Sequence, residues 1–288
     1  MKAATLSGLL AIVLWSSLAL LTTATEGLPP FEVLAISFGF AAAFGLLRTA
    51  FGGRGGWMQL RQPWPALTLT TAALFGYHAL YFIALKRAPA VEANLLNYLW
   101  PLLIVVFAGL LASVRIRGVQ IVGTLLGLAA AIVLVTRGSG IEIQPHYLPG
   151  YLAALGAAVI WAAYSVLNRR HAQVPSEAII VACALVALFG LLAHLGFEQS
   201  IRPRSMQWLV LALMGIGPVG AAFLLWDHGT KHGDLAVLGS LSYLSPLLST
   251  LLLVLAGRAE PHWSQALAIV LLMLGAWLSL RRVEPQPP

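Results

Sequence analysis

Residues 77–103, YHALYFIALKRAPAVEANLLNYLWPLL, form an apolar run that carries aromatic and polar side chains and closes on a proline. The back half of this stretch, residues 86–103 (KRAPAVEANLLNYLWPLL), recurs 145 positions later as residues 231–248 (KHGDLAVLGSLSYLSPLL). Seven of these eighteen positions are identical without a gap, and they include the prolines Pro101 and Pro246. The chain is therefore expected to contain an internal duplication whose two copies face each other across a shared site.

The composition is that of a membrane protein. Of the 288 residues, 59% are hydrophobic and only 9% are charged, and the mean hydropathy is +0.87. Soluble domains carry about 25% charged residues, so this chain cannot cover a water-facing surface. The net charge of +7 comes from Lys and Arg residues that stand singly or in pairs between apolar runs. Residues in such places set membrane topology, and no nucleic-acid partner is expected.

Ten apolar runs are long enough to cross a bilayer as helices, which takes about 20 residues each. No connection between them is long enough to hold a soluble domain, so the expected fold is an all-α integral membrane protein. The runs are residues 5–24, 31–50, 66–85, 90–113, 118–136, 149–168, 177–197, 206–226, 234–256 and 263–281.

The basic residues between the runs predict the orientation of the chain. Lys and Arg are enriched on the cytoplasmic side of membrane proteins. The side that holds the N-terminus carries eleven of them, against six on the other side, so both termini are expected in the cytoplasm. The eleven are Lys2, Arg48, Arg54, Arg61, Arg115, Arg117, Arg169, Arg170, Lys231, Arg281 and Arg282.

The duplication extends beyond the opening stretch. Residues 30–32 (PFE) before the second run match residues 175–177 (PSE) before the seventh, again at an offset of 145. The repeat unit is therefore five helices, and an odd number of crossings inserts the second copy from the opposite side. We expect two inverted repeats, residues 1–140 and 141–288. Inverted repeats are typical of transporters, whose substrate sites lie near the midplane where helices are interrupted.

The two matched prolines predict such interruptions. A proline inside a helix removes one hydrogen bond and displaces the carbonyl four residues earlier, which belongs to Asn97 for Pro101 and to Ser242 for Pro246. A carbonyl freed in lipid must be satisfied by protein, water or a ligand, so the paired breaks favour a substrate site. The alternative is a packing kink at which Asn97 and Ser242 hold helices together. Pro218, in the eighth run, is a further candidate hinge.

Aromatic side chains inside the runs point to the same site. Tyr77 and Tyr81 are four residues apart, and Trp161 and Tyr164 are three apart, so each pair shares one helix face. Phenols away from water need hydrogen-bonding partners, and faces of this kind would line a cavity for an aromatic or bulky apolar solute. The candidate substrate-binding residues are Tyr77, His78, Tyr81, Asn97, Tyr98, Trp100, Trp161, Tyr164, Ser242 and Tyr243.

One histidine lies inside an apolar run, and several tryptophans lie near the run ends. His78 is the one titratable group well inside the third run, and it is either a neutral wall of the cavity or a proton carrier. Five tryptophans near run ends are expected to be interfacial anchors. These are Trp57, Trp64, Trp208, Trp263 and Trp277.

Several motifs are missing from the sequence, and their absence excludes whole classes of protein. There is no G-x-x-x-x-G-K-[ST] loop for ATP, no H-E-x-x-H zinc motif and no G-x-S-x-G nucleophile motif. No pair of carboxylates falls in mid-membrane, so no enzyme and no cofactor are expected. His228 and His232 are four residues apart but lack a third ligand, so no metal site is expected. Asp227 closes the eighth run and is expected to cap it or to pair with Lys231.

Ten spans, short loops, a five-plus-five inverted repeat and the motifs NYLWPLL and SYLSPLL resemble the EamA-type drug/metabolite transporter superfamily. Within it, the chain is similar to the YddG-type aromatic amino acid exporters. The resemblance implies export of aromatic and other neutral amino acids across the bacterial inner membrane by alternating access. The substrate ring would stack on Tyr77, Tyr81, Trp100 and Trp161. Its ammonium group would meet Asn97, His78 and the freed carbonyls of Asn97 and Ser242. No buried carboxylate or cation is expected at the cavity, so a helix end, Tyr243 or water would meet the substrate carboxylate.

Alternative functions remain open at this point. The same cavity would suit other metabolites or lipophilic drugs, which cation–π contacts can bind. A lipid flippase, a lipid-modifying enzyme and a sensor or scaffold are further possibilities. The other expected partner is membrane lipid, and the chain is expected to be a monomer or a weak dimer, with Gly123 and Gly127 serving internal helix packing.

Overall fold

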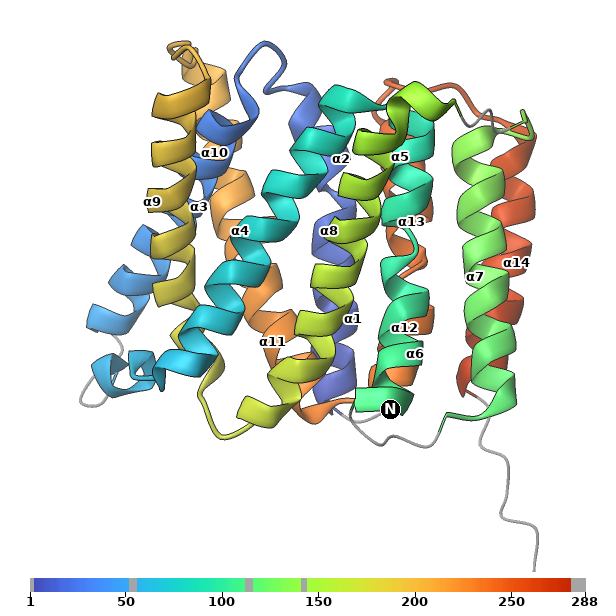
Figure 1. Cartoon of the computed structure of the whole chain (residues 1–288), viewed down its shortest axis with the longest axis horizontal. Helices are drawn as coiled ribbons and strands as arrows, with labels where there is room; N and C mark the ends of the chain where they lie inside the picture. The colour runs from blue at the N-terminus through green and yellow to red at the C-terminus, as the bar shows by residue number, and fades with distance from the viewer. Residues whose placement is uncertain (1–2, 52–55, 112–115, 141–143, 281–288) are drawn as a thin grey trace, which may run out of the picture.

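The computed structural model describes residues 3–51, 56–111, 116–140 and 144–280, and all regular structure in these ranges is helical (Figure 1). Five of the basic residues used to predict orientation, Lys2, Arg54, Arg115, Arg281 and Arg282, lie outside the described residues. The α-helices are α1 (Ala3–Ser16), α2 (Leu18–Thr23), α3 (Pro30–Phe51), α4 (Trp64–Arg87), α5 (Ala90–Asn97), α6 (Trp100–Leu111), α7 (Gly118–Thr136), α8 (Leu148–Leu167), α9 (Ile179–Phe197), α10 (Ser205–Met214), α11 (Ala222–His232), α12 (Leu235–Leu241), α13 (Leu244–Leu255) and α14 (Trp263–Leu280).

The helices follow the apolar runs and begin where proline sets the chain direction. Pro63 and Pro89 precede α4 and α5 with extended backbone, and Pro30 is the first residue of α3. Proline suits these positions because the first helical amides have no partner within the helix. Counting consecutive segments together, the described residues contain nine spans long and apolar enough to cross a membrane, and the apolar helix Trp263–Ser279 is shorter. The prediction of an all-helical membrane protein is confirmed at this level.

Two of the spans are broken just before the matched prolines. α5 and α6 are separated at Tyr98 and Leu99, and α12 and α13 are separated at Ser242 and Tyr243. The expectation that Pro246 leaves the carbonyl of Ser242 free is wrong. That carbonyl accepts a hydrogen bond from the amide of Ser245 (3.0 Å), because the chain tightens into a shorter turn at the break.

Two further irregularities lie in the first and eighth spans. The first span divides between α1 and α2 at Ser17, whose hydroxyl donates to the carbonyl of Leu14 (2.7 Å). Serine bonds of this kind compete with the helical ladder. Around Pro218 the helix widens into a π-helical segment, Gly215–Ala221, which accommodates a residue that has no amide hydrogen.

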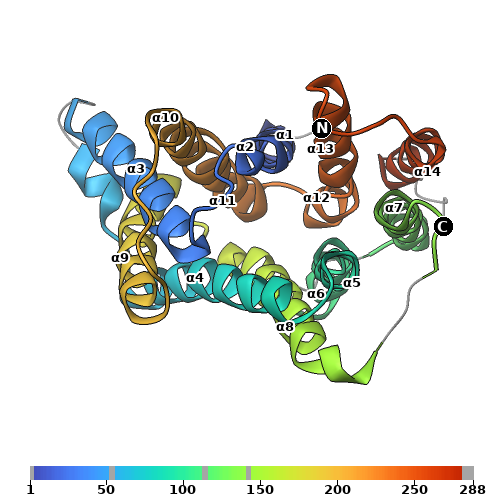
Figure 2. The same ribbon diagram turned by 90° about the horizontal axis from the view of Figure 1, so that it is seen from above.

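The helices pack in pairs that join the first part of the chain to the second. The most extensive contacts are those of α7 with α14, α3 with α9, α4 with α8, and α1 with α11. Seen from above, the α7–α14 and α3–α9 pairs stand at opposite ends, and α4 and α8 cross between them (Figure 2). At Gly123 the backbone of α7 approaches α14 so closely that a Cβ atom would lie 2.5 Å from the carbonyl oxygen of Gly275. Gly123 thus serves internal packing.

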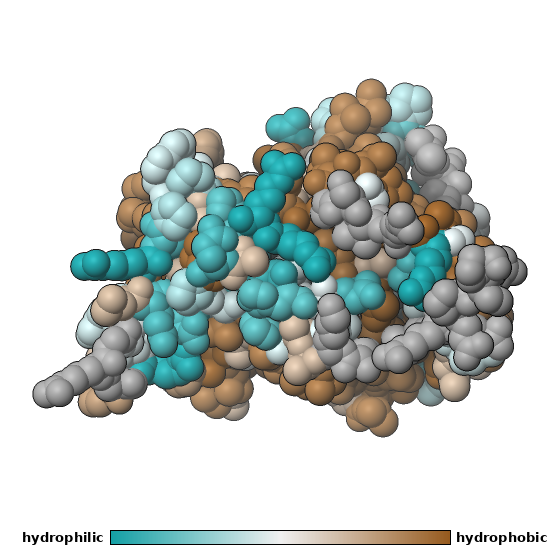
Figure 3. Space-filling view, turned by 90° about the horizontal axis from the view of Figure 1, so that it is seen from below, coloured by the Kyte–Doolittle hydropathy of each residue, from teal (hydrophilic) through white to brown (hydrophobic). Residues whose placement is uncertain are grey.

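The surface of the molecule matches a protein embedded in lipid. Large apolar side chains are exposed along many helices, as Leu110 (74%) and Met273 (68%) illustrate. The end seen from below carries polar side chains across its middle (Figure 3). The five tryptophans expected as anchors, Trp57, Trp64, Trp208, Trp263 and Trp277, are between 43% and 76% exposed.

Candidate functional site

Ten rings from six helices meet in the interior and form what we call the central aromatic cluster. The helices are α1, α3, α4, α6, α8 and α11, so both parts of the chain contribute. Each ring has its centroid within 6.2 Å of at least one other ring. The members are Trp15, Phe38, Tyr77, His78, Tyr81, Trp100, Trp161, Tyr164, Phe223 and Trp226.

Helix α4 supplies the half-buried wall of this cluster. Tyr77 and Tyr81 stack with centroids 6.0 Å apart and planes 9° apart, as their spacing of four residues requires. Tyr77 also lies 5.5 Å from Trp161 of α8. His78 packs edge-on against Phe38 (5.3 Å), and its Nδ1 donates to the carbonyl of Leu74 (2.7 Å). Because a carbonyl only accepts, Nδ1 carries a proton in this hydrogen bond.

The polar rim of the cluster comes from α5, which ends at the helix break. Asn97 is the last residue of α5, and its Nδ2 donates to the hydroxyl of Tyr77 (3.2 Å). Its Oδ1 is buried and accepts no hydrogen bond from any part of the chain that the structure describes. One turn earlier, Asn94 accepts a hydrogen bond from the hydroxyl of Tyr81. The break thus presents an amide oxygen to the aromatic cluster.

Five contributors were not among the candidate residues from the sequence, namely Trp15, Phe38, Asn94, Phe223 and Trp226. Asn94 stands three residues before Asn97, a spacing that places both on one helix face. Trp226 is fully buried, its Nε1 donates to the hydroxyl of Ser165 (3.1 Å), and its ring lies 5.0 Å from Trp15. The repeat offset of 145 could have found Trp226 and Phe223, since it aligns them with Tyr81 and His78.

Two of the residues expected at the site lie apart from the cluster. The ring of Tyr243 packs against Gly127 of α7 and belongs to a second apolar group formed with α14. The hydroxyl of Ser242 donates to the carbonyl of Leu238 in its own helix (2.7 Å). Tyr98, which directly follows Asn97, packs against the second group.

A buried ion pair lies directly beside the aromatic cluster, contrary to expectation. Nζ of Lys231 is 2.8 Å from Oδ2 of Asp227, and the two side chains are only 3% and 4% exposed. Oδ1 of Asp227 accepts from Nδ2 of Asn168 (2.8 Å), and Lys231 also donates to the carbonyl of Val174 (3.0 Å). An Asp227–Lys231 pair could be expected from the sequence. Its burial could not, because the helices that cover it come from other parts of the chain.

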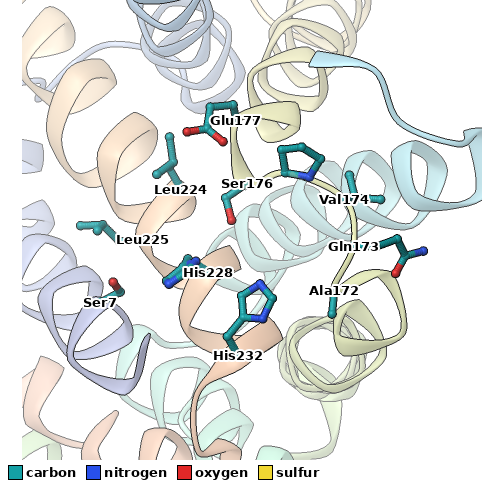
Figure 4. A pocket seen from close by; sticks show the side chains of 11 residues that line it. Ser7, Ala172, Gln173, Val174, Ser176, Glu177, Leu224, Leu225, His228 and His232 are labelled. Atoms are coloured by element: carbon teal, nitrogen blue, oxygen red, sulfur yellow. The ribbon is translucent and has the colours of Figure 1, made fainter. Parts of the chain in front are cut away.

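The opposite face of α11 borders a cavity of about 360 Å³ (Figure 4). His228 and His232 lie side by side on this face with ring centroids 5.0 Å apart. The segment before α9, including Val174 and Glu177, forms the other wall. Within the described residues no group of three or more His, Cys, Asp or Glu side chains could hold a metal ion.

Comparison with known proteins places the chain in a family. The model of the EamA-like transporter family matches it twice, at residues 2–136 and 148–281. The aromatic amino acid exporter YddG of Ancylobacter novellus is 49% identical over 276 residues, covering 96% of each chain, and that of Escherichia coli is 29% identical over 298 residues, covering 97% of this chain and 98% of the relative. A solved crystal structure with 47% identity superposes with a TM-score of 0.92 and covers 97% of each chain. The resemblance found in the sequence is confirmed, and the chain belongs to the EamA-like transporter family.

Proposed function

We propose that this protein exports aromatic and other neutral amino acids by alternating access, with the substrate bound at the central aromatic cluster. The observation that carries the proposal is the unpartnered, buried Oδ1 of Asn97, whose Nδ2 is bonded to Tyr77 of the aromatic cluster. A buried acceptor without a partner costs free energy. An ammonium group would satisfy it, while the side chain of an aromatic amino acid lies against the surrounding rings.

The surroundings of Asn97 support an aromatic amino acid as the substrate. Tyr77, His78 and Tyr81 are half-buried, so their rings retain surface that a substrate ring can cover. Edge-to-face and offset-stacked ring pairs add to the apolar burial that such contacts provide. The relatives named as aromatic amino acid exporters match the sequence of this chain over nearly their whole length, and this supports the same substrate class here.

The arrangement of helices supports an inverted five-plus-five repeat of ten spans, with units at residues 1–140 and 141–288. The most extensive contacts join helices of one unit to helices of the other, and the breaks at Pro101 and Pro246 occupy equivalent places. We place both termini in the cytoplasm and the chain in a bacterial inner membrane as a monomer or weak dimer. The breaks and the π-helical segment at Pro218 are the hinges of the proposed motion.

Export of lipophilic cations is the second candidate, because a buried carboxylate would favour it and Asp227 is one. Lys231 neutralises that carboxylate at 2.8 Å, however. A cationic substrate would therefore meet a site with no net negative charge.

The proposal is tested by measuring the flux of labelled tryptophan and phenylalanine in proteoliposomes, with and without a pH gradient. Saturable flux without a gradient would establish a facilitator and leave His78 as part of the wall. Flux only with a gradient would indicate proton coupling and make His78 the first residue to change. Absence of flux under both conditions, with tryptamine transported instead, would overturn the proposal in favour of cation export.

A further inference from the structure

The aromatic cluster continues without interruption into the buried ion pair. On α8 and its extension, Trp161, Tyr164 and Asn168 follow one another on one face. On α11, Asp227 comes directly after Trp226, whose ring belongs to the cluster, and Lys231 lies one turn further along. Asn168, one turn beyond Tyr164, donates to Oδ1 of Asp227 across the two helices (2.8 Å). Ring stacking and charge pairing thus occupy adjacent levels of the same interface.

The ion pair holds three elements together. Lys231 extends from α11 to the carbonyl of Val174 before α9, and Asp227 is bound to Asn168 at the end of α8. Just beyond the pair, the amide of Asp234 donates to the hydroxyl of Thr5 in α1 (3.0 Å). The pair therefore lies near the N-terminal end, which is the cytoplasmic end in the proposed topology and the end from which an exported substrate arrives.

A ligand with a single charge and a zwitterion have very different effects on a buried ion pair. Removing a single partner leaves the other charge buried without compensation, which is strongly unfavourable. A ligand that carries only an ammonium or only a carboxylate would create that situation. A zwitterion supplies both signs, so each protein charge exchanges one partner for another and neither is left alone.

We propose that Asp227 and Lys231 form a latch that selects zwitterionic amino acids. As the substrate enters, before it reaches Asn97, its carboxylate binds Lys231 in place of Asp227, and its ammonium group binds Asp227 in place of Lys231. Lys231 then releases the carbonyl of Val174, and the segment before α9 separates from α11. The proposal rests on the proposed function and adds a determinant of substrate class to it.

The corresponding lysine of the other repeat is not buried. Lys86 aligns with Lys231 at the repeat offset of 145, yet its side chain is 56% exposed and its Nζ lies 3.7 Å from Glu198. On the far side of the latch, Val174 lines the cavity of about 360 Å³, a volume within the range of small-molecule sites. Opening the latch would join that space to the aromatic cluster.

The test compares fluxes of tryptophan, tryptamine and indole-3-propionate in proteoliposomes, corrected for flux into protein-free liposomes. In the unaltered protein, the flux of each singly charged analogue should be lower than that of tryptophan by a factor of roughly ten or more. The reason is that the loss of one charge pair weakens binding by more than a factor of about ten. In D227N/K231M, which removes both charges, the ratio of tryptophan flux to analogue flux should fall toward one. D227K/K231D, which keeps a pair at the same spacing, should restore discrimination. R48M removes an exposed ion pair at 3.3 Å and serves as the matched control with an unchanged ratio.

The outcomes separate the two proposals. Equal fluxes of tryptophan and both analogues in the unaltered protein would overturn the latch without any variant. Tryptophan flux with the original ratio in D227N/K231M would overturn it as well. Absence of tryptophan flux in the unaltered protein would overturn the proposed function, and the latch with it.

Discussion

Replacing Asn97 tests the assigned acceptor most directly. Asn97→Ala removes the amide oxygen that no described residue engages and the bond to the hydroxyl of Tyr77 (3.2 Å). A hydrogen bond to a charged group contributes about 1.5–3 kcal/mol, which corresponds to an increase of roughly 10- to 150-fold in the KM for tryptophan. Because Tyr77 is half-buried and can bond to water, the folded protein should persist.

Asn97→Asp is the matched variant. A carboxylate keeps the acceptor, and the hydroxyl of Tyr77 can turn to donate to it. We therefore expect Asn97→Asp to keep or lower the KM while Asn97→Ala raises it. The assay is initial tryptophan flux in proteoliposomes over a range of concentrations, with the melting temperature in detergent measured in parallel. A wild-type KM in Asn97→Ala, or equal losses in both variants, would refute the role of the amide oxygen.

Three further predictions concern packing and charge. Gly123→Ala should lower the stability by about 1–3 kcal/mol, because the new Cβ would meet the backbone of α14, whereas Gly118→Ala on the same helix, with open space around it, should not; thermal unfolding distinguishes them. Lys231→Met leaves a buried carboxylate without its partner and should lower the free energy of unfolding by about 3–5 kcal/mol. Lys86 is exposed, so Lys86→Met should lower it by only about 0–1 kcal/mol. Equal melting temperatures of the two variants would contradict this prediction. Trp226→Ala leaves a cavity at the centre of the cluster, so the free energy of unfolding should fall by about 3–5 kcal/mol and tryptophan flux should be lost. A stable variant with normal flux would show that the ring contributes neither to stability nor to transport.

Local sequence signals were sufficient for the nine long spans of the described residues and for the two helix breaks before the matched prolines. Apolar length determines where a helix can cross lipid, and prolines interrupt or start helices for steric reasons that act within a few residues. This is why the breaks before Pro101 and Pro246 could be predicted. The break at Ser17 could not, because serine is tolerated in many membrane helices and gives no comparable signal.

The membership of the site was harder to predict, because it depends on the direction in which each side chain leaves its helix. Tyr98 and Tyr243 are equivalent in the repeat, yet Tyr98 is half-buried, whereas Tyr243 is fully buried against α7. Trp226 stands at the end of an apolar run, a place typical of an interfacial anchor, but α1, α6 and α8 enclose it. Asp227 and Lys231 are similarly enclosed by tertiary contacts that no local pattern reveals.

The pairing of helices across the two parts of the chain has a consequence for biosynthesis. α1, α3, α4 and α7 each make their most extensive contacts with a helix that follows residue 144. During translation these early spans enter the bilayer before their partners exist, and close approaches such as that of Gly123 to Gly275 cannot form until the final helix is inserted. Assembly should therefore be late and concerted. A ribosome that stalls midway would leave a product with unsatisfied packing faces, which membrane proteases can recognise.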